Sequence, residues 1–302
     1  MNRRLLVVLG MVFGLSLAIC GGAASVASAA PTSIINVPAQ VVQTSDGTVG
    51  YRSYGSGRPL VLIMGFSGSD DAWTPTLVNA LAKRHRVITF DLAGIGKTTM
   101  LPGTLTISAM ADQTAAMITA LHLNKPDVLG WSEGGMIAQA LAVRHPRDVR
   151  RLVLCATFLG NGKATVSVAA GTALYNAAVA GNFPALLKQM FPPDQEVTQS
   201  AAYQTSVLQY LDFHLPPAAV DQAQIKAAQG WGNGNEKAGH GRITVPTLIG
   251  DGAEDAVIPP VNVAKIARAI KGAKSTIYPD AGHMFLFQDA TAWAARVNRF
   301  LG

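Results

Sequence analysis

The chain has 302 residues, of which 49% are hydrophobic and 14% are charged. This balance excludes a charge-rich disordered chain, and the length is ample for a large buried core. The formal net charge is +6, but the basic residues are scattered and form no dense stripe with interleaved aromatic residues, so we expect no nucleic acid partner.

Residues 1–29 are predicted to be a signal peptide. Arg3 and Arg4 form a basic start, the uncharged apolar run 5–19 follows, and the segment ends in Ala-Ser-Ala at 27–29. The apolar run is shorter than the roughly 20 residues that span a bilayer, so we expect export and cleavage after Ala29 rather than a stable membrane span. Cys155 is then the sole cysteine of the mature chain, which rules out an intramolecular disulfide.

Short apolar runs alternate with amphipathic segments along the rest of the chain. Strands are expected at 59–64, 87–90, 128–130, 152–156, 247–249 and 276–278, after an opening hairpin formed by 40–42 and 49–54. Helices are expected at 106–121, 136–145, 261–271 and 291–301. This alternation predicts an α/β fold with a mostly parallel central sheet and helices on both faces.

The alternation is interrupted between Phe158 and Arg242 by Ala-rich helical stretches that contain several prolines. Because this insertion lies between two expected strands, we predict that residues 158–242 form a helical cap over the carboxyl ends of the strands. Residues 30–157 and 243–302 would then form the core of the fold.

Residues 128–136 read Val-Leu-Gly-Trp-Ser-Glu-Gly-Gly-Met, a short strand, a Gly-x-Ser-x-Gly motif and the start of a helix. A serine hydroxyl is a weak nucleophile until a base removes its proton, and a sharp strand-to-helix turn would present Ser132 to such a base. Gly130 and Gly134 would let the strand and the helix approach closely. The alternative is a glycine-rich turn with an incidental serine.

This motif resembles that of the α/β-hydrolase fold family, in its serine hydrolase branch of esterases and cofactor-free haloperoxidases. The resemblance extends to two further loops. Residues 248–259 are similar to the family's acid loop, in which Asp255 matches the acid, and residues 278–283 are similar to the loop that presents the histidine, here His283. The order Ser132, Asp255, His283 is the family's order.

The resemblance implies that His283 accepts the proton of Ser132 while Asp255 orients the imidazole. Asp251 and Glu254 lie in the same loop and remain alternatives for the acid.

The resemblance also implies an oxyanion hole formed by the backbone N–H groups of Phe66 and Glu133. Met64 stands before Gly65, where many family members have histidine. The residues expected to line an acyl pocket are Phe66, Trp131, Met284 and Phe285.

No cofactor is expected. The run 94–98, Gly-Ile-Gly-Lys-Thr, superficially suggests a phosphate-binding loop, but Asp91 stands where that motif requires its first glycine. We therefore expect no nucleotide. No set of His, Cys and carboxylate residues has the spacing of metal ligands, so we expect no metal.

These features predict a secreted serine hydrolase that cleaves a small carboxylic ester or related acyl compound through an acyl-enzyme. The same motifs also resemble those of perhydrolases, which are cofactor-free haloperoxidases, and of carbon–carbon bond hydrolases. A non-catalytic ligand-binding protein on the same fold is the alternative from a different class.

Overall fold

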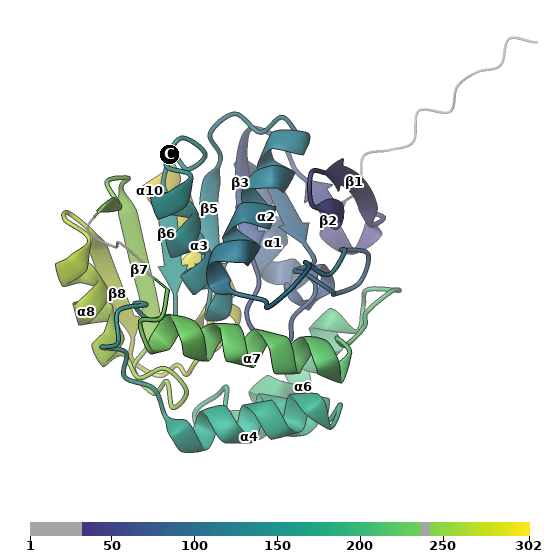
Figure 1. Ribbon diagram of the computed structural model, residues 1–302. Coiled ribbons are helices and arrows are strands. Elements are labelled where there is room, and N and C mark those ends of the chain that lie inside the picture. The colour runs from purple at the N-terminus through teal and green to yellow at the C-terminus, as the bar shows by residue number, and fades with distance from the viewer. Residues whose placement is uncertain (1–31, 237–241) are drawn as a thin grey trace, which may run out of the picture. The chain divides into compact units, whose positions relative to one another are not determined.

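A single sheet with strand order β1-β2-β4-β3-β5-β6-β7-β8 organises the computed structural model, which describes residues 32–236 and 242–302 (Figure 1). β2 pairs antiparallel with β1 and with β4, and all other neighbours are parallel. The strands are β1 (Gln40–Thr44), β2 (Gly47–Tyr54), β3 (Arg58–Ile63), β4 (His85–Phe90), β5 (Asp127–Trp131), β6 (Leu152–Cys155), β7 (Thr247–Gly252) and β8 (Lys274–Tyr278). The predicted opening hairpin and mostly parallel sheet are confirmed.

Helices cover both faces of the sheet. α2 packs against α3, and α1 packs against α10. The core helices are α1 (Pro75–Ala82), α2 (Ile107–Ala120), α3 (Glu133–Arg144), α8 (Val261–Ala269), α9 (Phe285–Gln288) and α10 (Ala290–Leu301), with short 3-10 turns η1 (Ile34–Asn36) and η2 (Asp70–Ala72). The sequence pattern did not predict α1 or α9, which are too short to show a clear helical period.

The central strands are buried on both faces, which explains their continuous apolar sequences. β5 and β6 are buried along their whole length, as are the last four residues of β3. Cys155 at the end of β6 is fully buried, and burial raises the pKa of its thiol well above the usual value. The thiol therefore acts as a small apolar packing group.

In the part of the segment between β6 and β7 that the structure describes, four helices lie within the predicted cap. They are α4 (Val168–Val179), α5 (Phe183–Leu187), α6 (Glu196–Val207) and α7 (Ala218–Gly232). α7 packs against α4 on one side and against α2 and α3 of the core on the other, and crosses one end of the sheet in Figure 1. We call the described part of residues 158–242 the cap; its boundaries stay a prediction.

The predicted signal peptide, residues 1–29, lies outside the described residues, so its removal stays a prediction. Among the helices that the structure describes, none combines the length and the apolar character needed to cross a bilayer.

The junction of β3, β5 and α3 is packed so closely that it requires glycine. A Cβ atom at Gly134 would lie 2.0 Å from the carbonyl oxygen of Ile63, and a Cβ atom at Gly130 would lie 2.1 Å from that of Gly134. Both obstacles are backbone atoms, which cannot rotate away.

We therefore expect Gly134→Ala to lower the free energy of unfolding by about 3 kcal/mol or more, because the added methyl group must separate α3 from β3. Gly171→Ala in α4 is the matched control, since nothing lies within 4 Å of its added Cβ. That change should leave stability unchanged or raise it by up to about 1 kcal/mol. Urea denaturation followed by circular dichroism measures both values, and a wild-type midpoint for Gly134→Ala would contradict this account of the junction.

Candidate active site

Ser132 occupies the turn between β5 and α3 in a strained backbone conformation. Its φ of 56° and ψ of −120° lie outside the regions that L-residues favour. The surrounding backbone holds this conformation: the Ser132 N–H donates to the carbonyl oxygen of Cys155 at 2.8 Å, and the Ser132 carbonyl accepts from the Thr157 hydroxyl at 2.8 Å. The predicted strand-to-helix turn is therefore present, with Ser132 at its apex.

Three side chains from the carboxyl ends of three strands form a hydrogen-bonded chain. Ser132 Oγ lies 2.9 Å from His283 Nε2, and His283 Nδ1 lies 2.7 Å from Asp255 Oδ2. Since a carboxylate can only accept, Nδ1 carries the imidazole proton and Nε2 is left to accept the proton of the serine hydroxyl. All three side chains are buried, so little water competes for these bonds.

Asp255 is oriented by donors on both of its carboxyl oxygens. Its Oδ1 accepts from the backbone N–H groups of Val257 and Ile258, both at 2.8 Å, while Oδ2 faces His283. The loop between β7 and α8 thus fixes the direction of this carboxylate.

Asp251 and Glu254, the alternatives for the acid, do not contact His283. Glu254 is exposed to solvent, whereas Asp251 is fully buried and its side chain is hydrogen-bonded to that of Asp255. Burial, followed by the charge of Asp255, raises the pKa of Asp251 far above its usual value. Asp251 is therefore the protonated member of the pair, and Asp255 carries the charge.

The two predicted oxyanion donors lie on either side of Ser132. A Cβ atom at Gly65 would be 3.1 Å from the Cβ of Ser132, so the loop that carries Phe66 passes directly beside the serine. Glu133 is the first residue of α3, where N–H groups have no partner within the helix. Among the described residues, neither the Phe66 nor the Glu133 N–H donates a hydrogen bond, which leaves both available.

The side chain of Glu133 is buried, and neither of its carboxyl oxygens has a partner among the described residues. Burial, followed by the charge of Asp221, raises the pKa of Glu133 to about 8. Glu133 is therefore mainly neutral at pH 7. A negative charge so close to the two N–H groups would oppose binding of an anion there.

A small apolar cavity of about 30 Å³ is lined by the sequence neighbours of Ser132 and His283. Phe66, Trp131 and Met284 line it, as the sequence predicted, whereas Phe285 does not. The structure corrects the prediction for Phe285: its ring is fully buried and packs on Trp293, with 5.1 Å between ring centroids. The volume is close to that of one water molecule, so a substrate must displace side chains of the cavity wall.

The cap supplies much of this wall, through residues that no sequence signal had singled out. Its contributions are Phe183, Leu186, Leu187, Met190, Tyr203, Phe213, His214 and Leu215. Because these residues are spread over α5, α6, the loop between them and the loop before α7, their convergence depends on how the cap folds back.

His214 also belongs to a buried ionic network that joins the cap to the core. Its Nδ1 lies 3.2 Å from Asp71 Oδ2, and the hydrogen bond to Asp71 raises the pKa of His214 to about 9. Arg52 of β2 pairs with Asp70 at 2.5 Å and with Asp212 of the cap. No sequence pattern predicts this network, because its partners lie far apart in the chain: Arg52 and Asp212 are separated by 160 positions.

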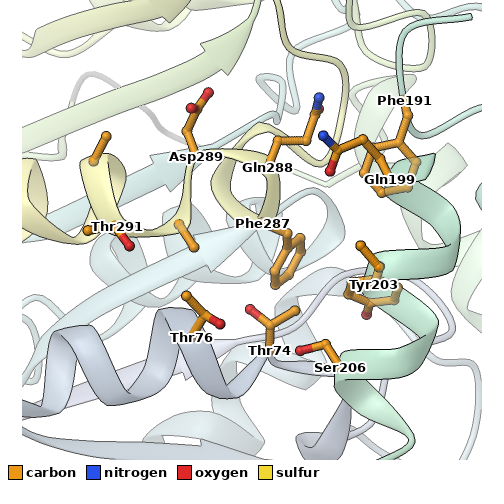
Figure 2. Close-up of a pocket in the computed structure, with 13 residues that line it drawn as sticks. Thr74, Thr76, Phe191, Gln199, Tyr203, Ser206, Phe287, Gln288, Asp289 and Thr291 are labelled. Carbon is orange, nitrogen blue, oxygen red and sulfur yellow. The ribbon is translucent and has the colours of Figure 1, made fainter. Parts of the chain in front are cut away.

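A larger cavity of about 380 Å³, which Ser132 does not line, is formed by residues of α1, α6, α9 and α10 (Figure 2). Threonine, serine and glutamine side chains line it together with Tyr203 and Phe287. Phe287 packs on Trp131 and on Tyr203, with 5.3 Å between the ring centroids of each pair. Tyr203 lines both cavities, so its ring is part of the wall between them.

The segment that suggested a phosphate loop is a structural turn. The Asp91 carboxylate accepts from the backbone N–H groups of Asp70 and Lys97, at 2.9 and 3.2 Å. Within residues 32–236 and 242–302, no three His, Cys, Asp or Glu side chains are grouped so that they could hold a metal ion.

Comparison with known proteins places this geometry in a family. The sequence model of the alpha/beta hydrolase fold family matches residues 58–290. The chain is 30% identical over 257 residues to a protein of Mycobacterium tuberculosis (strain ATCC 25618 / H37Rv) named as a non-heme bromoperoxidase, BpoC. The aligned region covers 83% of this chain and 96% of that protein. It is also 30% identical over 261 residues to the 2-hydroxymuconate semialdehyde hydrolase of Pseudomonas sp. (strain CF600), covering 82% of this chain and 88% of that enzyme.

The fold is also similar to that of solved structures. The alpha/beta hydrolase fold protein from Chitinophaga pinensis superposes with a TM-score of 0.74 at 24% identity, over 88% of this chain and 98% of that one. This chain belongs to the alpha/beta hydrolase fold family.

Proposed function

We propose that this protein is a secreted serine hydrolase that cleaves a carboxylic ester or related acyl compound through an acyl-enzyme. The observation that carries the proposal is the hydrogen-bonded chain of Ser132, His283 and Asp255 beside two unused backbone N–H groups. A nucleophile, a base, an orienting carboxylate and an oxyanion site are the parts that acyl transfer requires.

In the proposed mechanism, Ser132 Oγ attacks the acyl carbon while His283 Nε2 takes the hydroxyl proton. Asp255, held by its N–H donors, stays ionised and stabilises the imidazolium. The N–H groups of Phe66 and Glu133 bind the oxygen that becomes negative. The imidazolium then gives its proton to the leaving alkoxide, and a water molecule activated by His283 hydrolyses the acyl-enzyme.

Two alternatives use the same parts. The relatives named above as a bromoperoxidase and as a 2-hydroxymuconate semialdehyde hydrolase favour perhydrolysis and carbon–carbon bond hydrolysis. A non-catalytic binding protein is less well supported, because binding alone does not need the strained serine or the neutral Glu133. Export is part of the proposal and rests on the sequence of residues 1–29.

We expect a fluorophosphonate probe to label the mature protein once, at Ser132, since only an activated serine attacks its phosphorus. Ser132→Ala and His283→Ala should abolish labelling, whereas Ser206→Ala on α6 is the control and should label normally. Mass spectrometry of the labelled peptide identifies the site.

Among esters of graded acyl length, we expect the enzyme to hydrolyse those with short acyl groups fastest, because the cavity holds about 30 Å³. A wild-type protein without labelling or turnover would favour the binding protein.

We expect Asp255→Asn to lower kcat by about 10⁴, because an asparagine would stabilise the wrong imidazole tautomer. Asp251→Asn should keep most of the activity, because asparagine resembles the protonated acid that Asp251 already is. Steady-state kinetics with circular dichroism as a check on folding compares them. If kcat falls further in the folded Asp251→Asn protein than in Asp255→Asn, then Asp251 is the acid that orients His283.

We expect kcat/KM of the wild type to fall above about pH 8, as Glu133 loses its proton beside the oxyanion site. The sign follows from charge: a new anion at Glu133 repels the developing oxyanion, so the ionised form is the slower one. In Glu133→Gln this alkaline decline should disappear, while kcat/KM below pH 8 should stay close to that of the wild type. An alkaline decline that persists unchanged in Glu133→Gln would contradict this assignment.

A further inference from the structure

Ser67, which follows the oxyanion donor Phe66, has an unfavourable backbone conformation. Its φ is 60°, a left-handed value that is unfavourable for residues other than glycine. The turn itself is closed by the hydrogen bond from the Gly68 N–H to the Gly65 carbonyl at 3.2 Å. Such strain persists where surrounding groups impose it, and the contacts of Ser67 identify those groups.

Two side chains of α7 hold Ser67. The Ser67 N–H donates to Gln224 Oε1 at 2.9 Å, and the Ser67 hydroxyl lies near enough to the Asp221 side chain to counter part of the rise that burial causes in its pKa. Asp221 and Gln224 are three residues apart, so they lie on the same face of the helix. One face of a cap helix thus holds both the backbone and the side chain of a residue in the oxyanion loop, which we define as Gly65–Gly68.

The same face of α7 also lies near the second oxyanion donor. The charge of Asp221 acts on the side chain of Glu133, the residue whose N–H follows the nucleophile. Asp221 therefore lies near the start of α3, and α7 contacts α3. Both halves of the oxyanion site have α7 as a neighbour.

The need to pack α7 against the core does not explain why Asp221 and Gln224 are polar. Asp221 is 1% exposed and Gln224 is 0% exposed, and Asp221 Oδ1 and Gln224 Nε2 have no partner among the described residues. Buried polar atoms without partners destabilise a fold, and apolar side chains would hold α7 in place without that cost. Val220, Ala227 and Trp231 on the same helix already provide apolar packing.

We propose that Asp221 and Gln224 are positioning residues that hold the oxyanion loop in its catalytic conformation through Ser67. The oxyanion site is then complete when α7 of the cap is seated on the core, and lifting α7 inactivates the enzyme without moving Ser132, His283 or Asp255. This inference rests on the proposed function, because it assumes that Phe66 and Glu133 bind an oxyanion.

Gln224→Leu tests the proposal by removing the acceptor of the Ser67 N–H with little change in volume. We expect kcat to fall roughly 10- to 100-fold, because a loosened donor is missed mainly in the transition state. KM should change less than threefold, since the cavity wall does not include Gln224. The rate of labelling by the fluorophosphonate should fall in parallel with kcat.

Two further variants separate positioning from packing. Gln224→Glu keeps an oxygen for the Ser67 N–H, so its kcat should exceed that of Gln224→Leu. Its kcat should come closest to the wild-type value measured at the same pH when the pH is low enough for the introduced carboxyl to be neutral. Gln222→Leu, at an exposed position on the same helix, is the matched control and should behave as wild type. Circular dichroism and melting temperatures establish that each variant is folded.

A folded Gln224→Leu protein with wild-type kcat, or with a loss confined to KM, would overturn the proposal. If Gln224→Leu does not fold, Ser67→Ala decides instead, because it removes the loop's hydroxyl alone: a several-fold loss of kcat supports the proposal and an unchanged kcat refutes it. A wild type that neither turns over esters nor reacts with the probe refutes the proposed function itself. Normal labelling of the wild type with unaffected variants refutes this inference alone.

Discussion

The close approach of β3, β5 and α3 is the constraint on which the rest of the site depends. Gly130 and Gly134 leave no space for a Cβ atom, so the chain reverses direction within a few residues and forces Ser132 to a φ of 56°. The strain is offset by the packed core beneath it, where the central strands are fully buried. A hydroxyl group held above the end of a sheet in this way cannot retreat from its base, and that loss of freedom lowers the entropic cost of attack.

Parallel topology brings the remaining groups to the same place. The oxyanion loop follows β3, Ser132 follows β5, Asp255 follows β7 and His283 follows β8, and all of these strands run in one direction. Their carboxyl ends therefore meet at one edge of the sheet. Residues separated by 151 positions, such as Ser132 and His283, need no further device to come within hydrogen-bond distance.

Local motifs explain why so much of this could be predicted from the sequence. Each core element of the site is a strand end followed by a short loop, so the spacing around Ser132, Asp255 and His283 is visible in consecutive residues. The limits of that approach show at Met284 and Phe285. The side chains of these two neighbours point to different places because α9 begins between them. Met284 faces the cavity, whereas Phe285 packs on Trp293 in the core. A sequence that is apolar at both positions does not reveal that turn.

The cap is the part that the sequence could not place. Gln224 and Ser67 are 157 positions apart, and nothing near either residue indicates that they are partners. Their contact depends on the path of the whole insertion. That path is also held by the ion pair between Asp212 of the cap and Arg52 of β2. The surroundings of the buried acids differ in the same way. Asp255 has donors on both oxygens, whereas Asp251 has one N–H donor, that of Gly252, and Glu133 has none among the described residues, and burial raises the pKa of both. A carboxylate pattern in the sequence therefore identifies candidates, and burial together with the donors that the fold aims at each one decides which carries the charge.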